Sequence, residues 1–140
     1  MADNGLTTVP SSHAVKHTID RLEADVKRKG MTVFARIDHA QGARDAGLPL
    51  RPTELLIFGN ARGGTPPMQI QQTIGIDLPL KALAWEDAAG KVAINCQTRC
   101  TRATNGDTLV HEQFACGQSD GACNSEVDRI AVIGVRERLT

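Results

Sequence analysis

Several kinds of residue are scarce in this chain of 140 residues, and each scarcity excludes a class of protein. Aromatic residues make up 3% of the sequence and tyrosine is absent, so we expect no surface that stacks single-stranded nucleic acid on aromatic rings. Neither sign of charge is in excess, because 16 Lys and Arg balance 16 Asp and Glu. A nucleic-acid partner held by its phosphates is therefore not expected.

Long apolar runs are missing as well. No stretch reaches the roughly 18 apolar residues that span a bilayer, and residues 1–17 lack the apolar segment of a secretory signal. We therefore expect a cytoplasmic protein with no membrane partner, in a compartment that keeps thiols reduced. A composition of 41% hydrophobic and 23% charged residues fits one soluble domain with a modest core.

Hydrophobic periodicity predicts a helix followed by a strand. Apolar residues recur at helical spacing within residues 11–30, at Val15, Ile19, Leu22 and Val26. Ser11 or Ser12 is the expected N-cap of this helix, and Gly30 is its expected end. The period then changes to two, which places Met31, Val33, Ala35 and Ile37 on one face of a half-buried strand.

Turn residues mark the elements that follow. Asp38 is expected to cap a short helix over residues 39–46, and residues 54–58 form a short apolar strand. Thr65 before Pro66 predicts a helix over residues 66–73, and a turn at residues 87–90 joins two further strands. The predicted fold is α+β, an antiparallel sheet backed by helices, in the order strand-helix-strand-strand-helix-strand-strand with the short helix after the second strand.

The glycine-rich turn over residues 59–65 joins a predicted strand to a predicted helix, a place where anions bind. Thr65 stands where a phosphate-binding loop has lysine, so the nucleotide motif is absent. Pro66 and Pro67 also lack the N–H groups that a phosphate needs. The preferred interpretation of the turn is therefore a tight strand-to-helix connection, and the alternative interpretation is a ligand site.

All four cysteines lie in the last third of the chain, at Cys96, Cys100, Cys116 and Cys123. The first pair has a spacing used by zinc sites, whereas the second pair is spaced too widely for a standard one. We expect no metal and no cofactor. The alternative metal site consists of Cys96, Cys100, His111 and Cys116.

Separated motifs give the chain a family resemblance. They cover residues 32–40 (TVFARIDHA), 50–60 (LRPTELLIFGN), 77–81 (DLPLK) and 85–87 (WED). Over about residues 5–95 the chain resembles the domain-of-unknown-function 302 family, which implies a compact α+β domain of TATA-binding-protein-like arrangement, a homodimer and no established activity. The signature positions of the family are the candidate ligand-binding residues: His39, Glu54, Gly59, Asn60, Thr65 and Met68.

The chain departs from the family pattern at about residue 96. The family continues with a Tyr-Asn-Pro-like turn and a helix, whereas this chain becomes rich in cysteine, threonine and arginine. We predict a family-like core over residues 1–95 and a divergent or frameshifted segment over residues 96–140 that completes the same domain. Loss or replacement of the closing helix would leave one face of the sheet bare and favour dimerisation or strand exchange.

Three hypotheses for function follow. The leading one is a dimeric module that binds a small polar ligand near the glycine-rich turn, His39 and Glu54. The second is an enzyme that uses His39 and Glu54 as an acid/base pair, which requires the two side chains to converge. The third is a structural or protein-interaction dimer, which predicts a flat apolar interface and no pocket near Asn60.

Overall fold

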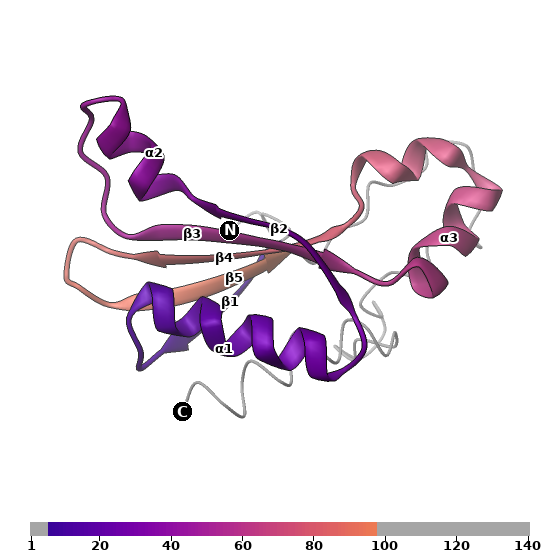
Figure 1. Cartoon of the computed structure of the whole chain (residues 1–140), viewed down its shortest axis with the longest axis horizontal. Coiled ribbons are helices and arrows are strands. Elements are labelled where there is room, and N and C mark those ends of the chain that lie inside the picture. Colours follow the sequence, from indigo (N-terminus) through magenta and orange to yellow (C-terminus); the bar gives the residue numbers. More distant parts are fainter. Residues whose placement is uncertain (1–5, 98–140) are drawn as a thin grey trace.

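The computed structural model describes residues 6–97. Its elements are β1 (Leu6–Ser11), α1 (Val15–Arg28), β2 (Thr32–Asp38), α2 (His39–Asp45), β3 (Thr53–Gly59), α3 (Ala61–Ile70), the 3-10 helix η1 (Gln72–Ile76), β4 (Leu80–Glu86) and β5 (Val92–Gln97). The five strands form one antiparallel sheet in the order β1-β5-β4-β3-β2. Figure 1 shows α1 along the sheet, with α2 and α3 at opposite ends of it. The α+β prediction is confirmed.

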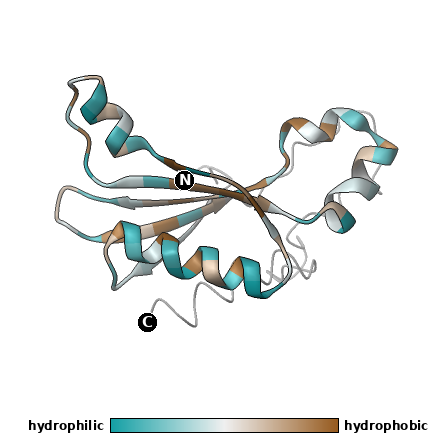
Figure 2. Ribbon diagram, viewed as in Figure 1, coloured by the Kyte–Doolittle hydropathy of each residue, from teal (hydrophilic) through white to brown (hydrophobic). Residues whose placement is uncertain are grey.

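Helix α1 buries the apolar stripe that its sequence predicts: Val15, Ile19, Leu22 and Val26. Figure 2 shows brown positions alternating with teal ones along this helix. The helix begins at Val15 rather than at Ser11, and its N-cap residue, Ala14, has no side-chain cap. Ser11 instead ends β1, and its hydroxyl accepts a hydrogen bond of 3.2 Å from the N–H of His13. The chain leaves the helix through Gly30, whose φ of 78° suits glycine.

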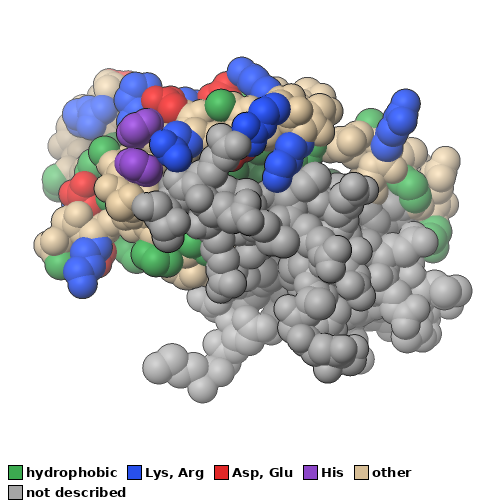
Figure 3. All heavy atoms as spheres, turned by 90° about the horizontal axis from the view of Figure 1, so that it is seen from below, with side chains coloured by type: hydrophobic (Ala, Val, Ile, Leu, Met, Phe, Trp, Pro, Cys, Tyr) green, Lys and Arg blue, Asp and Glu red, His purple; other side chains and the backbone are tan. Residues whose placement is uncertain are grey.

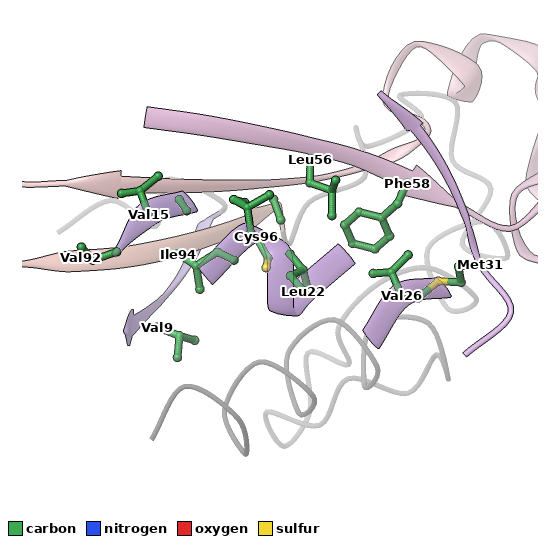
Figure 4. Packing of buried hydrophobic residues seen from close by; sticks show 13 residues of the cluster. Val9, Val15, Leu22, Val26, Met31, Leu56, Phe58, Val92, Ile94 and Cys96 are labelled. Carbon is green, nitrogen blue, oxygen red and sulfur yellow. The ribbon is translucent and has the colours of Figure 1, made fainter. Parts of the chain in front are cut away.

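The hydrophobic core lies between α1 and one face of the sheet, the covered face (Figure 4). Its strand residues include Val9 of β1, Leu56 and Phe58 of β3, and Ile94 and Cys96 of β5. The strand β5 runs to Gln97, so the core uses Cys96, which lies one residue beyond the predicted boundary of the family-like segment. Residues 98–140, on which the rest of the tail prediction falls, lie outside the described residues.

A β-bulge changes the face on which half of β2 lies. The register between β2 and β3 shifts between Val33 and Ala35, so the residues after the shift exchange faces. Val33 packs against the core, and Arg36 lies on the covered face opposite Leu56. Ile37 lies on the other face and is 38% exposed. The prediction of Val33, Ala35 and Ile37 on one face is therefore wrong.

The predicted helix cap at Asp38 and the predicted turn at residues 87–90 are both confirmed by their hydrogen bonds. The carboxylate of Asp38 accepts a hydrogen bond of 2.8 Å from the N–H of Gln41 and so caps α2. In the turn between β4 and β5, the Asp87 carboxylate accepts hydrogen bonds from the N–H groups of Ala89 and Lys91. Gly90 completes this turn with a φ of 75°.

Helix α3 begins earlier than predicted. It starts at Ala61, because Asn60 and not Thr65 provides the cap: its side-chain oxygen accepts a hydrogen bond of 2.9 Å from the N–H of Arg62. Pro66 and Pro67 lie inside the helix. Since they lack N–H groups, they remove two intrahelical hydrogen bonds.

The second face of the sheet, here called the open face, carries no helix along its strands within residues 6–97 (Figure 1). The register places these residues on it: Thr8 and Pro10 of β1, Ala93 and Asn95 of β5, Lys81, Leu83 and Trp85 of β4, Thr53, Leu55 and Ile57 of β3, and Ala35 and Ile37 of β2. Lys81 is the charged residue among them. The open face is therefore a largely apolar surface.

Candidate functional site

The candidate residues fall into two groups at opposite ends of β3. Glu54 lies near the start of this strand, and Gly59 ends it. At about 3.3 Å per residue these two positions are about 17 Å apart. His39, which begins α2, belongs to the first group, and Asn60, Thr65 and Met68 follow Gly59 in the second. The six residues do not converge on one site within the chain.

Glu54 forms a structural ion pair. Its side chain is buried on the covered face, with the residue 7% exposed, and its Oε2 accepts hydrogen bonds from Nε and Nη2 of Arg36 at 2.9 and 2.8 Å. Both N–H groups of Arg36 donate to the same carboxylate oxygen, and such charge-assisted hydrogen bonds are stronger than neutral ones. Glu54 is therefore engaged in joining β2 to β3 and is not presented to a ligand.

The same arginine also reaches the helix. Nη1 of Arg36 donates to Oδ1 of Asp20 at 2.6 Å and to Oε2 of Glu23 at 3.1 Å, both on α1. The hydrogen bond from Arg36 lowers the pKa of Asp20. The pKa of Glu23 is also lowered, first by the hydrogen bond from Lys27 and then by the one from Arg36. One guanidinium thus connects three carboxylates from two layers of the fold.

His39 is exposed at the first position of α2. No hydrogen bond or ion pair of the described residues joins it to Glu54, whose carboxylate bonds to Arg36. The structure therefore does not assemble the acid/base pair that the second hypothesis requires.

The second group lies in the segment that leaves the sheet after β3, forms α3 and η1, and returns to the sheet in β4. A Cβ atom at Gly59 would lie 3.3 Å from Cβ of Pro79 and 3.5 Å from Cε2 of Phe34, so this position has little room for a side chain. Asn60 is used as the cap of α3. These two residues have structural roles at the point where the chain leaves β3.

Met68 of α3 packs against η1, within the same segment between β3 and β4. A Cβ atom at Gly75 of η1 would lie 3.2 Å from Sδ of Met68, so the thioether lies directly against this glycine. Met68 is half-buried, whereas Thr65 is exposed on α3. Met68 of this helix thus packs against η1, whereas Thr65, like Asn60, faces solvent.

Within residues 6–97 there is no group of three or more His, Cys, Asp or Glu side chains placed to hold a metal ion. Cys96 is buried in the core cluster. The other ligands of the alternative zinc set, Cys100, His111 and Cys116, lie outside the described residues.

Sequence reasoning predicted a bare face of the sheet but missed the role of Arg36 and the polar row on that face. Arg36 was expected beside Phe34 on the side of β2 away from Val33, and the bulge reverses this. On the open face, the indole N–H of Trp85 donates to Oδ1 of Asn95, and the amide of Asn95 donates to Oγ1 of Thr8 at 2.7 Å. This polar row crosses three strands. The sequence signal for it was the lone tryptophan of a predicted strand.

Comparison with known families and structures gives two matches, and the description of each one names DUF302. A family described as "Domain of unknown function DUF302" matches residues 7–99. The fold resembles the crystal structure of an uncharacterized conserved protein DUF302 from Bacillus stearothermophilus, with a TM-score of 0.63 and 23% identity, covering 69% of this chain and 75% of that one. This second likeness concerns the fold alone.

Three relatives carry the name of a transport protein. Fluoride-specific ion channel FluC 1 of Brucella suis is 59% identical over 90 residues, which are 64% of this chain and 35% of that protein. FluC 1 of Brucella abortus and FluC 2 of Brucella melitensis have the same identity over 33% of their lengths. The chain thus spans about a third of these relatives. Within residues 6–97, no helix has the length and apolar character to cross a membrane.

Proposed function

This chain belongs to the DUF302 family, and from that premise we propose that it is a non-catalytic binding domain that pairs with a second copy through its open face. The observation that carries the proposal is the open face itself. Leu55, Ile57, Leu83 and Trp85 lie next to one another on three-residue stretches of β3 and β4. They form an apolar centre for an interface, which is the composition that obligate interfaces use.

The size of the open face supports this partner. Five strands about 4.8 Å apart and about six residues long cover about 500 Å² in plan, before the relief of the side chains is counted. Stable interfaces bury about 800 Å² per partner. Phe34 of the edge strand β2, which is 58% exposed and is not among the residues counted above, extends the apolar area toward that value.

The charge of the open face supports a second copy over a charged partner. Lys81 is its charged strand residue, and its Nζ donates to the carbonyl oxygens of Asp77 and Pro79. A surface with so little charge places no like charges against each other when it faces a copy of itself. Charge repulsion therefore does not oppose the pairing of identical surfaces that we propose.

The other two hypotheses receive less support from the geometry. An acid/base enzyme needs a titratable pair within hydrogen-bond reach, and His39 and Glu54 do not form one. A ligand site made of all six candidates would need both ends of β3 at once. Asn60 and Met68 are used in a cap and in packing against η1.

Sedimentation velocity of the full chain tests the pairing. We expect a dimer for the wild type and a monomer for Leu83→Lys, because the new ammonium would be buried without a partner. Leu48→Lys is the matched control, since Leu48 is 63% exposed in the loop between α2 and β3. Thr8→Arg, at an exposed position of the open face, gives the same charge insertion where folding tolerates it. A dimer that survives both open-face variants, or a wild type that stays monomeric, overturns the proposal.

A second candidate function concerns ion transport. The identity of 59% to proteins named fluoride-specific ion channels, over about a third of their length, favours a domain that works beside such a channel. Pairing of two such domains would bring two channel segments together.

Fluoride efflux from liposomes tests this role on the Brucella suis relative. We expect slower efflux from the protein that lacks its matched 90-residue segment than from the intact protein. Equal efflux at equal protein density would contradict an accessory role and leave the pairing of the open faces to be judged by sedimentation.

A further inference from the structure

Two histidines that are not candidate residues of the family pattern lie side by side around the start of α1. His13 and His17 are four positions apart, and their ring centroids are 4.8 Å apart with the ring planes tilted by 52°. His17 is exposed and His13 is half-buried. Figure 3 shows histidine side chains adjacent to each other at the molecular surface.

The backbone of His13 is fixed although it precedes the helix. Its N–H donates to Oγ of Ser11 at 3.2 Å, and its carbonyl oxygen accepts a hydrogen bond of 3.3 Å from Oγ1 of Thr18. The hydroxyls of Ser11 and Thr18 bond to each other at 2.8 Å, and Thr18 is fully buried. His17 is held by the helix itself. Both imidazoles are thus mounted on ordered backbone, as a preformed ligand pair requires.

The separation of the rings fits a shared metal ion. A Zn–N bond is about 2.0–2.1 Å, and with about 1.1 Å from nitrogen to ring centre, each centroid lies about 3.2 Å from the metal. For coordination angles of about 90–110°, the two centroids are then about 4.5–5.2 Å apart. The observed separation of 4.8 Å falls inside this range.

The charged groups that act on the two histidines or on their neighbour Asp20 are the cations Lys16, Arg21 and Arg36, which do not bind a metal ion, and the carboxylate of Asp20 itself. Asp20 lies on the next turn, but its carboxylate bonds to Nη1 of Arg36 at 2.6 Å. Lys16, between the histidines in sequence, has a side chain that is 77% exposed. The remaining coordination positions of a bound ion would therefore be open to water or to a donor from another molecule.

We propose that His13 and His17 form a binding site for a divalent first-row transition metal ion of the kind that imidazole prefers, such as Zn²⁺, Ni²⁺ or Cu²⁺. Two neutral nitrogens do not suit Mg²⁺ or Ca²⁺, which take oxygen ligands. His17 lies in the first turn of α1 and His13 lies just before the helix, so the pair is held by backbone on both sides of the helix start. The site is independent of the open face and of pairing.

Zinc titration of the full chain, followed by NMR of the histidine rings, tests the site. We expect the ring signals of His13 and His17 to shift together and to saturate at one Zn²⁺ per chain. His17→Gln and His13→Gln should each weaken binding by about tenfold or more, because the second ligand of a chelate acts at high effective concentration. His39→Gln is the matched control, since it removes an exposed histidine from α2, and Mg²⁺ is the control ion.

The chain also has four cysteines, which are competing zinc ligands. The ring signals distinguish zinc held by the two histidines from zinc held elsewhere. Zinc that is bound with no shift of the His13 and His17 rings is held by other groups and overturns the site. Equal affinity in His17→Gln and the wild type overturns it as well. Circular dichroism of both variants shows whether α1 is intact.

Discussion

Arg36 joins the two layers of the fold through hydrogen bonds to both of them. It bonds to the buried carboxylate of Glu54 on β3 and to Asp20 and Glu23 on α1. Its own side chain is 25% exposed and that of Glu54 is 9% exposed, so this pair is shielded from solvent far better than a surface pair. Removal of one partner leaves the other charge buried.

We expect Arg36→Ala to lower the free energy of unfolding by about 2–3 kcal/mol, because the Glu54 carboxylate loses its counter-ion. Lys27→Ala is the control: it removes an ion pair to Glu23 whose lysine side chain is 60% exposed, and such pairs contribute about 0.5 kcal/mol. Urea unfolding measures both. Equal losses in the two variants would show that Arg36 acts as an ordinary surface charge.

Arg36 also contributes to the acidic limb of the stability curve, together with Lys27, which is the first cause of the lowered pKa of Glu23. Because the folded-state pKa values of Asp20 and Glu23 are lowered, their contribution is complete above their unfolded pKa values of about 4 and is lost as the pH falls through the folded values. Wild-type stability should therefore fall below about pH 4.

The fall should be shallower in Arg36→Ala, since this variant lacks the hydrogen bonds from Arg36 to Asp20 and Glu23. Urea unfolding at a series of pH values should show the difference between the two proteins narrowing toward about pH 3. If the difference in unfolding free energy between the two proteins did not change with pH, the protonation of these two carboxylates would not be coupled to Arg36.

At the scale of the element, the sequence predicts whatever depends on local spacing. The stripe of α1, the cap of α2 by Asp38 and the turn at Gly90 all follow from patterns a few residues long. The side of β2 that Arg36 occupies does not, because one extra residue at the bulge reverses it without any sequence signature. The ion pair to Glu54 could therefore not be predicted.

The start of α3 shows a second limit. Thr65 followed by Pro66 is a strong pattern for a helix N-terminus, yet Asn60 caps the helix five residues earlier. Two glycines, Gly63 and Gly64, follow the true start, and their low helix propensity hides it. Local propensity favours Thr65 as the cap. The structure uses Asn60, and the return of the chain through η1 to β4 is compatible with that earlier start.

Two glycines test how tightly the elements are built. Gly42 lies inside α2 with nothing within 4 Å of an added Cβ, whereas a Cβ at Gly59 would lie 3.3 Å from Cβ of Pro79. We expect Gly42→Ala to raise the free energy of unfolding by about 0.5–1 kcal/mol. Gly59→Ala should lower it by about 1 kcal/mol through overpacking. Thermal unfolding checks both, and a stabilised Gly59→Ala would show that Pro79 yields.

For the whole molecule, one asymmetry dominates: α1 covers one face of the sheet within the described residues, and the other face presents apolar side chains. The family match ends at residue 99, close to the point where the sequence departs from the family pattern. The prediction that residues 96–140 are divergent or frameshifted stays a prediction, since residues 98–140 lie outside the described part. Pairing of two open faces is the arrangement that this asymmetry favours.

Trp85 gives the most direct test of that pairing, because it lies on the open face and is the chain's single tryptophan, with no tyrosine present. Its fluorescence should be recorded over a dilution series of the full chain, together with the sedimentation coefficient. We predict that the emission maximum moves to shorter wavelength as the dimer forms, and that Leu83→Lys abolishes both changes. A dimer that forms while the emission of Trp85 stays unchanged would contradict pairing through the open face.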